Sequence, residues 1–207
     1  REDFAAHRDE LIISSKAGWD MWAGPYGQGG GSRKYVLASL DQSLRRVGVE
    51  YFDIFYSHRF DPDTPLEETS DAMGDILASG KARYFGVSNC RGWRIAEVVR
   101  VCGELGVARP VACQPYYNAM NRQPEPEVLP ACHHYGIGVA SYSPVARGVL
   151  VGKYAPGEPP PEGTRAGRSD RRMMQTEFRP ESLEMAQALK AHAERKGMTA
   201  TEFAVGW

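Results

Sequence analysis

The stretch Tyr51-Phe52-Asp53-Ile54-Phe55-Tyr56-Ser57-His58 is a short apolar run that ends in a polar side chain. It is rich in aromatic residues and too short for a buried helix, so it predicts a strand. Four further runs of the same kind lie at residues 11–15, 82–88, 111–114 and 137–142. The sequence therefore predicts five short strands.

Segments with a helical spacing of apolar residues separate these strands. Val36, Leu40, Leu44 and Val47 form one apolar stripe, and residues 95–105 form another. Signals for helix ends accompany them: Thr64 before Pro65, a capping box from Thr199 to Glu202, and glycines at Gly48, Gly80 and Gly106. Because strand and helix together recur about every 30 residues, each repeat has the size of a βαβ unit.

Such alternation implies parallel strands with right-handed crossovers, in either a closed barrel or an open, doubly wound sheet. The carboxyl ends of the expected strands favour the barrel, because all of them carry polar or ring-bearing side chains: Lys16, His58, Ser88, Asn89, Gln114, Tyr142 and Ser143. In a barrel these ends surround one mouth where active sites form, whereas an open sheet gathers ligands at one switch point. We therefore expect residues 1–207 to form one α/β domain with the architecture of a (β/α)8 TIM barrel.

Charge and cysteine content narrow the function classes. The 25 Lys and Arg residues balance 26 Asp and Glu residues, and a net charge of -1 creates no field that attracts nucleic acid or an anionic membrane. Four cysteines without a CxxC pair are typical of the reducing cytoplasm, and no apolar run approaches the roughly 18 residues of a membrane helix. We expect a cytoplasmic protein with a small-molecule ligand and with no nucleic-acid or membrane partner. The sequence leaves open whether copies of the chain form a homo-oligomer.

Metal binding is not expected. Cys132, His133 and His134 are neighbours on a predicted helix, where successive side chains point about 100° apart and cannot converge on one ion. Both ends of the chain predict a fragment, since it begins at Arg1 in a polar stretch and stops at Trp207 inside an apolar run.

Several strand-end residues have both a structural and a chemical interpretation. Lys16 is either an exposed lysine or an ammonium at the barrel mouth that lowers the pKa of an adjacent acid or forms a Schiff base. His58 is either a core or rim residue or a hydrogen-bond donor to a carbonyl oxygen. The side-chain amides of Asn89 and Gln114 can both donate and accept hydrogen bonds, which is what recognition of another amide requires. Asn89 suits the role of a structural cap equally well. Tyr142 either stacks on a flat ring or packs in the core.

Two loops have similar alternatives. Residues 27–32 are glycine-rich, but they lack the pattern of a phosphate loop, so we expect a flexible loop leading to Ser32 as the N-cap of a helix. The long irregular stretch at residues 143–180 predicts a lid, a binding loop or disorder. Its arginines indicate a solvated surface, an anion clamp or, least of all, a nucleic-acid patch: Arg165, Arg168, Arg171, Arg172 and Arg179.

Beyond these patterns, the chain resembles the aldo-keto reductases, in the branch that holds L-glyceraldehyde 3-phosphate reductases and potassium-channel β subunits. The likeness is carried, in order along the chain, by residues 12–18, 24–27, 39–46, 53–59, 80–89, 114–118 and 143–154. The resemblance implies hydride transfer from NADPH to an aldehyde or ketone. It assigns Lys16 as the lysine that lowers the pKa of a catalytic tyrosine, and His58 as the histidine that orients the carbonyl. The alternatives are an NADPH-binding regulatory subunit and, more remotely, a Schiff-base lyase on an unrelated barrel.

The resemblance also implies the cofactor contacts. It assigns Ser88, Asn89 and Gln114 to the nicotinamide amide, Tyr142 to its ring, and the pyrophosphate and nearby phosphates to Ser143, Pro144, Ala146, Gly148, Leu150, Lys153 and Arg165. It places the catalytic tyrosine and aspartate before Arg1, and the binding site for the 2′-phosphate after Trp207. Tyr26 follows Lys16 in another loop and is no substitute. We therefore expect an incomplete barrel, missing the first strands and the last βα unit, and a fragment that is inactive and unstable alone.

Overall fold

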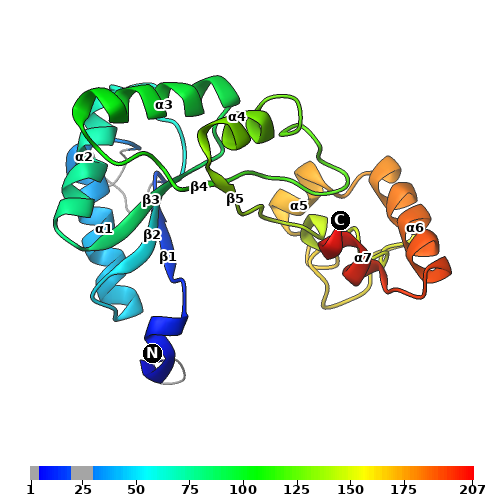
Figure 1. The fold of residues 1–207 in the computed structure, drawn as a ribbon. Coiled ribbons are helices and arrows are strands. Elements are labelled where there is room, and N and C mark those ends of the chain that lie inside the picture. Colours follow the sequence, from blue (N-terminus) through cyan, green and yellow to red (C-terminus); the bar gives the residue numbers. More distant parts are fainter. Residues whose placement is uncertain (1–4, 20–29) are drawn as a thin grey trace. The chain divides into compact units, whose positions relative to one another are not determined.

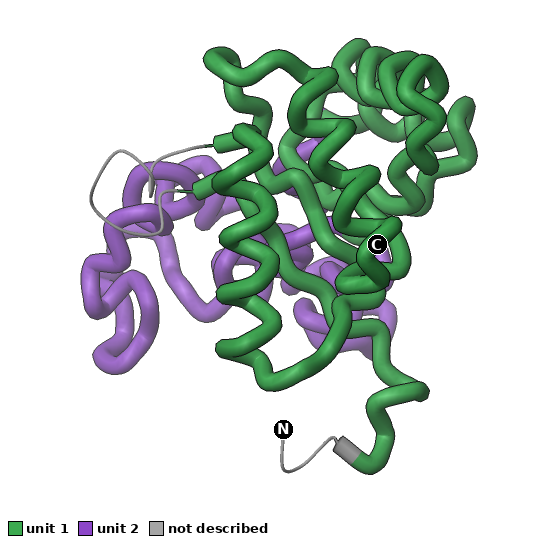
Figure 2. The backbone as a smooth tube through the Cα atoms, turned by 90° about the vertical axis from the view of Figure 1, so that its left-hand side faces the viewer, with its two compact units in different colours: residues 1–115, 124–140 green, residues 116–123, 141–207 purple. Residues whose placement is uncertain are grey.

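A computed structural model describes residues 5–19 and 30–207 of the chain. The segment at residues 24–27 and the first glycines of the 27–32 loop therefore lie outside the described residues. The chain divides into two compact units (Figure 2), one made of residues 1–115 and 124–140 and the other of residues 116–123 and 141–207.

The first unit holds a five-stranded parallel sheet with the strands in chain order. The strands are β1 (Ser14–Ala17), β2 (Phe52–Ser57), β3 (Ala82–Ser88), β4 (Ala112–Gln114) and β5 (Gly138–Val139). A 3-10 turn η1 (Ala5–Glu10) precedes them, and the helices are α1 (Arg33–Val47), α2 (Leu66–Ala78), α3 (Gly92–Leu105) and α4 (Val128–Tyr135). Helices α1, α2 and α3 cover one face of the sheet, as Figure 1 shows.

The strand order confirms the predicted α/β class and favours the predicted barrel type. In a doubly wound sheet the order reverses at a switch point, whereas here each strand adds beside the previous one. Successive crossovers of one hand place all their helices on the same face, and α1 packs on α2, α2 on α3, and α3 on α4. This is the winding of a βα barrel.

The core of the first unit lies between this sheet and its helices. Phe52, Phe55 and Tyr56 of β2 are all buried, in line with the apolar character of inner strands in parallel sheets. Helix α1 ends as predicted at Gly48, whose positive φ of 75° lets its N–H donate to the Leu44 carbonyl oxygen at 2.8 Å.

Three boundaries differ from the prediction. β1 starts at Ser14 rather than residue 11: Ile12 is 78% exposed, and the backbone N–H of Ile13 donates to the side-chain oxygen Oδ2 of Asp53. Lys16 therefore lies inside the strand. β5 is only two residues long. Thr64 does not cap α2, since its hydroxyl donates to Asp61 Oδ2 and Pro65 occupies the N-cap position.

The second unit is built around its own core. Its elements are a 3-10 turn η2 (Ala146–Gly148) and the helices α5 (Arg171–Thr176), α6 (Pro180–Arg195) and α7 (Ala200–Gly206). Leu150, Tyr154 and Met173 are fully buried there, so the irregular stretch at residues 143–180 packs as part of a folded unit. The predicted capping box between Thr199 and Glu202 is present at the start of α7.

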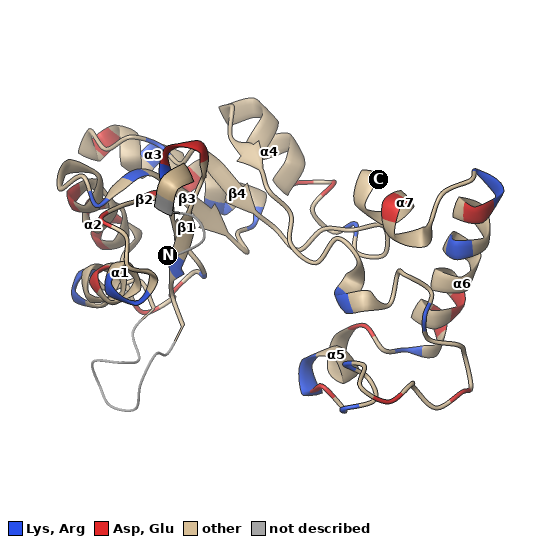
Figure 3. Cartoon of the chain, turned by 90° about the horizontal axis from the view of Figure 1, so that it is seen from below, with Lys and Arg blue, Asp and Glu red and all other residues tan. Residues whose placement is uncertain are grey.

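Charged positions are mixed in sign along the helices. Both basic and acidic positions occur along α3 and α6 (Figure 3), in line with the near-zero net charge. Among the residues with described structure, no helix has the length and apolar character that crossing a lipid bilayer requires.

Candidate active site

Lys16 and His58 lie at the carboxyl edge of two neighbouring strands. Lys16 of β1 is paired in register with Tyr56, two residues before His58, and the His58 N–H donates to the carbonyl oxygen of Ala17 at 2.8 Å. The Lys16 ammonium lies 5.4 Å from the centre of the Tyr56 ring. Burial of the half-buried side chain lowers the pKa of Lys16 below its usual range. The backbones of Lys16 and His58 therefore lie on neighbouring strands at one edge of the sheet, and the Lys16 ammonium is partly desolvated.

A hydrogen bond from Trp19 determines which ring nitrogen of a neutral His58 carries the proton. The Trp19 indole N–H, which can only donate, hydrogen-bonds to His58 Nε2 at 3.3 Å, and the two rings meet edge-to-face at 5.7 Å between centroids. A neutral His58 therefore carries its proton on Nδ1 in this arrangement.

A hydrogen-bond network joins the ends of β2, β3 and β4. The Asn89 side-chain NH₂ donates to the His58 carbonyl oxygen and to Ser88 Oγ, both at 3.0 Å. The Ser88 hydroxyl is buried and donates to the Gln114 carbonyl oxygen at 2.7 Å. Asn89 has a φ of 55°, a conformation that asparagine adopts more readily than most residues. The Gln114 side-chain amide has no hydrogen-bond partner among the residues that the structure describes.

Exchanging Asn89 for Asp tests this network. The carboxylate keeps the size of the amide and tolerates the same φ, but it places acceptor oxygens against the His58 carbonyl and loses both donated bonds. We expect NADPH to bind about 10-fold to 100-fold more weakly to Asn89→Asp, since the loss of two bonds and the unsatisfied acceptors amounts to about 1–3 kcal/mol. NADPH fluorescence titration measures the change, and Gln123→Glu, the same amide-to-carboxylate exchange at an exposed residue of the second unit, is the matched control. Unchanged NADPH affinity in Asn89→Asp would contradict the prediction.

The remaining predicted residues belong to the second unit. Tyr142 does not extend β5 as predicted; it forms an isolated bridge with Tyr116, and the two rings stack at 5.3 Å with an interplanar angle of 24°. The Ser143 carbonyl oxygen accepts hydrogen bonds from Asn118 Nδ2 at 3.0 Å and from the Ala146 N–H at 2.9 Å. Pro144 between them is exposed.

An unusual turn follows. Ala146, Arg147 and Gly148 have successive φ values of 46°, 55° and 95°. Two of these residues are not glycine, so the turn is strained and requires support from its surroundings. Ala146 and Leu150 are fully buried beside it.

The structure places Lys153 beside this turn. A Cβ atom placed on Gly148 would lie 3.2 Å from Lys153 Nζ, so the exposed ammonium stands directly beside the turn. Arg165 instead pairs with Asp170 at 2.9 Å. The hydrogen bond from the Met173 N–H, and to a smaller extent the one from Arg165, hold the pKa of Asp170 below its usual value. The other predicted arginines of this stretch are exposed: Arg168, Arg171, Arg172 and Arg179.

Glu177 is a residue that the sequence analysis missed. Its side chain is 3% exposed and pairs with Arg147 Nε at 2.9 Å, and the Tyr116 hydroxyl donates to it at 2.6 Å. Thr176 Oγ1 also donates to this carboxylate. No sequence signal marks Glu177, because its partners Arg147 and Tyr116 lie 30 and 61 residues away in the chain.

The raised pKa of Tyr116 makes the contribution of this cluster to the free energy of unfolding depend on pH. Burial, and then the hydrogen bond to Glu177, raise the pKa of Tyr116 from 10.0 to about 12. An acid whose pKa is raised in the folded state stabilises the fold fully below the unfolded pKa and loses that contribution as the pH rises through the folded pKa. We expect the free energy of unfolding to fall more steeply between pH 10 and about 12 in the native protein than in Tyr116→Phe. Urea unfolding at several pH values measures both slopes, and equal slopes would contradict the prediction.

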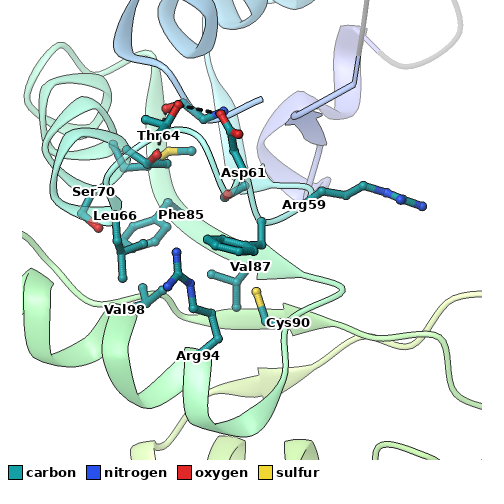
Figure 4. A pocket seen from close by; sticks show the side chains of 15 residues that line it. Arg59, Asp61, Thr64, Leu66, Ser70, Phe85, Val87, Cys90, Arg94 and Val98 are labelled. Carbon is teal, nitrogen blue, oxygen red and sulfur yellow. Dashed lines mark hydrogen bonds between the residues drawn. The ribbon is translucent and has the colours of Figure 1, made fainter. Parts of the chain in front are cut away.

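A separate hollow lies in the first unit, on the helix-covered side of the sheet. Its volume is about 30 Å³, and it is lined by apolar side chains of α2, β3 and α3, including Leu66, Phe85 and Val98. Arg94 points into it, and Arg59 points away from it (Figure 4). None of the predicted site residues lines this hollow.

None of the four cysteines is exposed: Cys102, Cys113 and Cys132 are buried, and Cys90 is partly buried. Burial raises the pKa of Cys90 and of Cys102 to about 11, so both remain protonated thiols at neutral pH. Cys113 and Cys132 are both buried and hydrogen-bond to each other; this bond together with burial raises the pKa of Cys113, and the same bond lowers the pKa of Cys132. The chemistry of the site therefore rests on its lysine, histidine, amide and hydroxyl groups.

Comparisons with known proteins identify relatives of this chain. The model of the aldo/keto reductase family matches residues 2–207. The chain is 45% identical over 214 residues to "L-glyceraldehyde 3-phosphate reductase" of Escherichia coli O157:H7, covering 100% of this chain and 60% of the relative. It is 34% identical over 210 residues to "Probable voltage-gated potassium channel subunit beta" of Oryza sativa subsp. japonica, covering 99% of this chain and 62% of the relative. The chain thus spans about 60% of the length of these relatives. The chain belongs to the aldo/keto reductase family.

Proposed function

We propose that the full protein reduces the carbonyl group of an aldehyde or ketone to an alcohol, with NADPH as the hydride donor. The observation that carries the proposal is the placement of Lys16 and His58 at the carboxyl edge of adjacent parallel strands, in a chain of this family. An edge of this kind is where βα barrels build their active sites.

The donor set fits a nicotinamide dinucleotide. In the first unit, the Gln114 amide is unbonded among the described residues and can both donate to and accept from a carboxamide, next to Ser88 and Asn89. In the second unit, Tyr142 offers an aromatic face, and the turn at residues 146–148 lies beside the Lys153 ammonium, which suits a phosphate group. Ser143, Pro144 and Leu150 flank that turn, and Arg165 is proposed near the phosphates despite its pairing with Asp170.

NADPH supplies the hydride when it is bound. As the hydride reaches the carbonyl carbon, negative charge builds on the oxygen, and donors already aimed there stabilise the transition state more than the ground state. Lys16 contributes a half-buried positive charge that water screens less than an exposed one. The resemblance assigns proton donation to a tyrosine outside residues 1–207, whose pKa Lys16 would lower.

His58 orients the carbonyl. With Nε2 accepting from Trp19, the neutral ring donates only through Nδ1. For Nε2 to donate to the carbonyl, the hydrogen bond from Trp19 must first break. The proton then either moves from Nδ1 to Nε2, or His58 takes up a second proton at Nε2.

A small phosphorylated aldehyde such as glyceraldehyde 3-phosphate is the proposed substrate. Its support is the printed name of two relatives that are 45% and 44% identical to this chain. We expect the full protein to show a kcat/KM at least about tenfold higher for glyceraldehyde 3-phosphate than for glyceraldehyde, because charge-assisted hydrogen bonds to the phosphate are each worth about 1.5–3 kcal/mol. NADPH oxidation assays with both substrates test this. Equal values would reject the phosphorylated substrate class.

The second candidate is an NADPH-binding regulatory subunit in the same cytoplasmic setting. It is favoured by relatives from rice and Arabidopsis thaliana, each 34% identical, whose printed names describe a potassium-channel β subunit. The two functions differ in turnover, since a regulatory subunit binds NADPH without rapid oxidation. Tight NADPH binding with no aldehyde-dependent NADPH oxidation would favour the regulatory subunit.

A further inference from the structure

Glu177 uses both oxygens of a buried carboxylate. Oε1 accepts from the Tyr116 hydroxyl at 2.6 Å, and Oε2 accepts from Arg147 Nε at 2.9 Å. The Arg147 side chain is 11% exposed, so the ion pair is almost completely removed from water. Removing either partner of such a pair leaves an uncompensated charge, so the arrangement is held firmly only while it is complete.

The two partners belong to different parts of the proposed cofactor site. Tyr116 stacks on Tyr142, the ring proposed to face the nicotinamide, and is bridged to it through the backbone. Arg147 is the middle residue of the strained turn at residues 146–148, which is proposed to hold the pyrophosphate. One carboxylate therefore connects the aromatic surface with the phosphate turn, and all of these residues lie in the second unit.

The strain in the turn indicates what this connection does. Ala146 and Arg147 adopt positive φ values that non-glycine residues hold only when their surroundings enforce them. Asn118 fixes the start of the turn through the Ser143 carbonyl oxygen, and Glu177 fixes its middle through the Arg147 guanidinium. Without Glu177, the Arg147 side chain loses its buried partner and the turn loses one of these two supports.

We propose that Glu177 is a positioning residue that presets the Tyr142 ring and the turn at residues 146–148 for NADPH before the cofactor binds. This proposal rests on the proposed function, because it concerns the same cofactor. Preorganisation increases affinity by removing the ordering that binding would otherwise require. Glu177 itself does not contact the cofactor in this proposal, so its loss affects NADPH binding and spares the hydride-transfer step.

The test compares Glu177→Gln with Glu184→Gln in the full protein. The first substitution keeps an acceptor for the Tyr116 hydroxyl but removes the charge that pairs with Arg147, whereas Glu184 is an exposed residue of α6. We expect the dissociation constant of NADPH, measured by fluorescence titration, to rise about tenfold in Glu177→Gln. At saturating NADPH, kcat and the KM for the aldehyde stay within about twofold of the native values, because only a binding contribution is lost. Glu184→Gln matches the native protein in all three quantities.

Tyr116→Phe is the second variant, because it removes one arm of the connection and leaves the ion pair in place. We expect a smaller rise of the NADPH dissociation constant, about threefold, since one hydrogen bond is lost. Native affinity for NADPH in folded Glu177→Gln would overturn the proposal, as would an equal loss in kcat and in aldehyde KM. A native protein that binds no NADPH would instead reject the proposed function itself.

Discussion

Replacing Lys16 with Met is expected to lower kcat for carbonyl reduction about 10²-fold to 10⁴-fold, the range of a lost contribution to acid–base catalysis. The physical reason is the position of the ammonium at the carboxyl edge of β1, where partial burial already lowers its pKa. Methionine has a similar length and keeps the apolar packing over the Tyr56 ring, but it provides no charge. NADPH affinity is expected to stay within about threefold, because Lys16 is assigned to the acid and not to the cofactor.

Lys81→Met is the matched control. Lys81 lies at the opposite, amino end of the same sheet, directly before β3, and forms an exposed ion pair with Asp41 at 2.8 Å. Such surface pairs contribute about 0–1 kcal/mol, so this variant is expected to retain native kcat. NADPH oxidation by the full protein measures both variants. If Lys16→Met retained its activity, or if native and variant rates were equally low, the catalytic assignment would be wrong and the regulatory subunit would be favoured.

The local sequence signals predicted the boundaries of the inner strands closely. The run at residues 82–88 became β3 without any change of boundary, and the run at residues 51–57 differs from β2 by one residue. These two strands are central, so their apolar content reflects burial on both sides. The ends of the sheet were predicted less well, because hydrogen bonds and not apolar content decide where β1 begins.

The candidate site was predictable where it depends on strand ends. His58 and Asn89 each follow a parallel strand, and Lys16 is the third residue of the four-residue strand β1, so strand register places all three toward the carboxyl edge of the sheet. The contacts between side chains were not predictable in the same way. The Trp19 bond to His58 spans 39 residues, and it determines which imidazole nitrogen can donate.

The second unit shows the limit of the sequence analysis more clearly. A stretch with many prolines and arginines predicted a lid, a binding loop or disorder, yet Leu150, Tyr154 and Met173 give it a core. These apolar residues have no regular period, and they converge only because η2, α5 and α6 fold back on one another. The burial of Glu177 follows from that packing, so neither its charge nor its neighbours in the chain predicted it.

The expected stability effect is largest at Phe55. Its ring is fully buried and stacks on Phe52 at 6.3 Å, and its backbone pairs in register with Ser15 of β1 and Phe85 of β3. We expect Phe55→Ala to lower the free energy of unfolding by about 3–5 kcal/mol, because truncation of a core phenylalanine loses apolar burial and leaves a cavity. Phe60→Ala is the matched control: Phe60 is 48% exposed, so the expected loss is about 1 kcal/mol or less.

Urea unfolding of the full protein, followed by hydrogen exchange of the β2 amides, measures both phenylalanine variants. Because β2 lies between β1 and β3, loosening it releases the two strand ends that carry Lys16 and Asn89 as well as its own His58. In Phe55→Ala the β2 amides are therefore expected to exchange faster with solvent, and NADPH is expected to bind more weakly. Both changes follow from the larger fraction of molecules in which the strand is unfolded. Equal destabilisation by both variants would show that the sheet is not the structure that holds the site together.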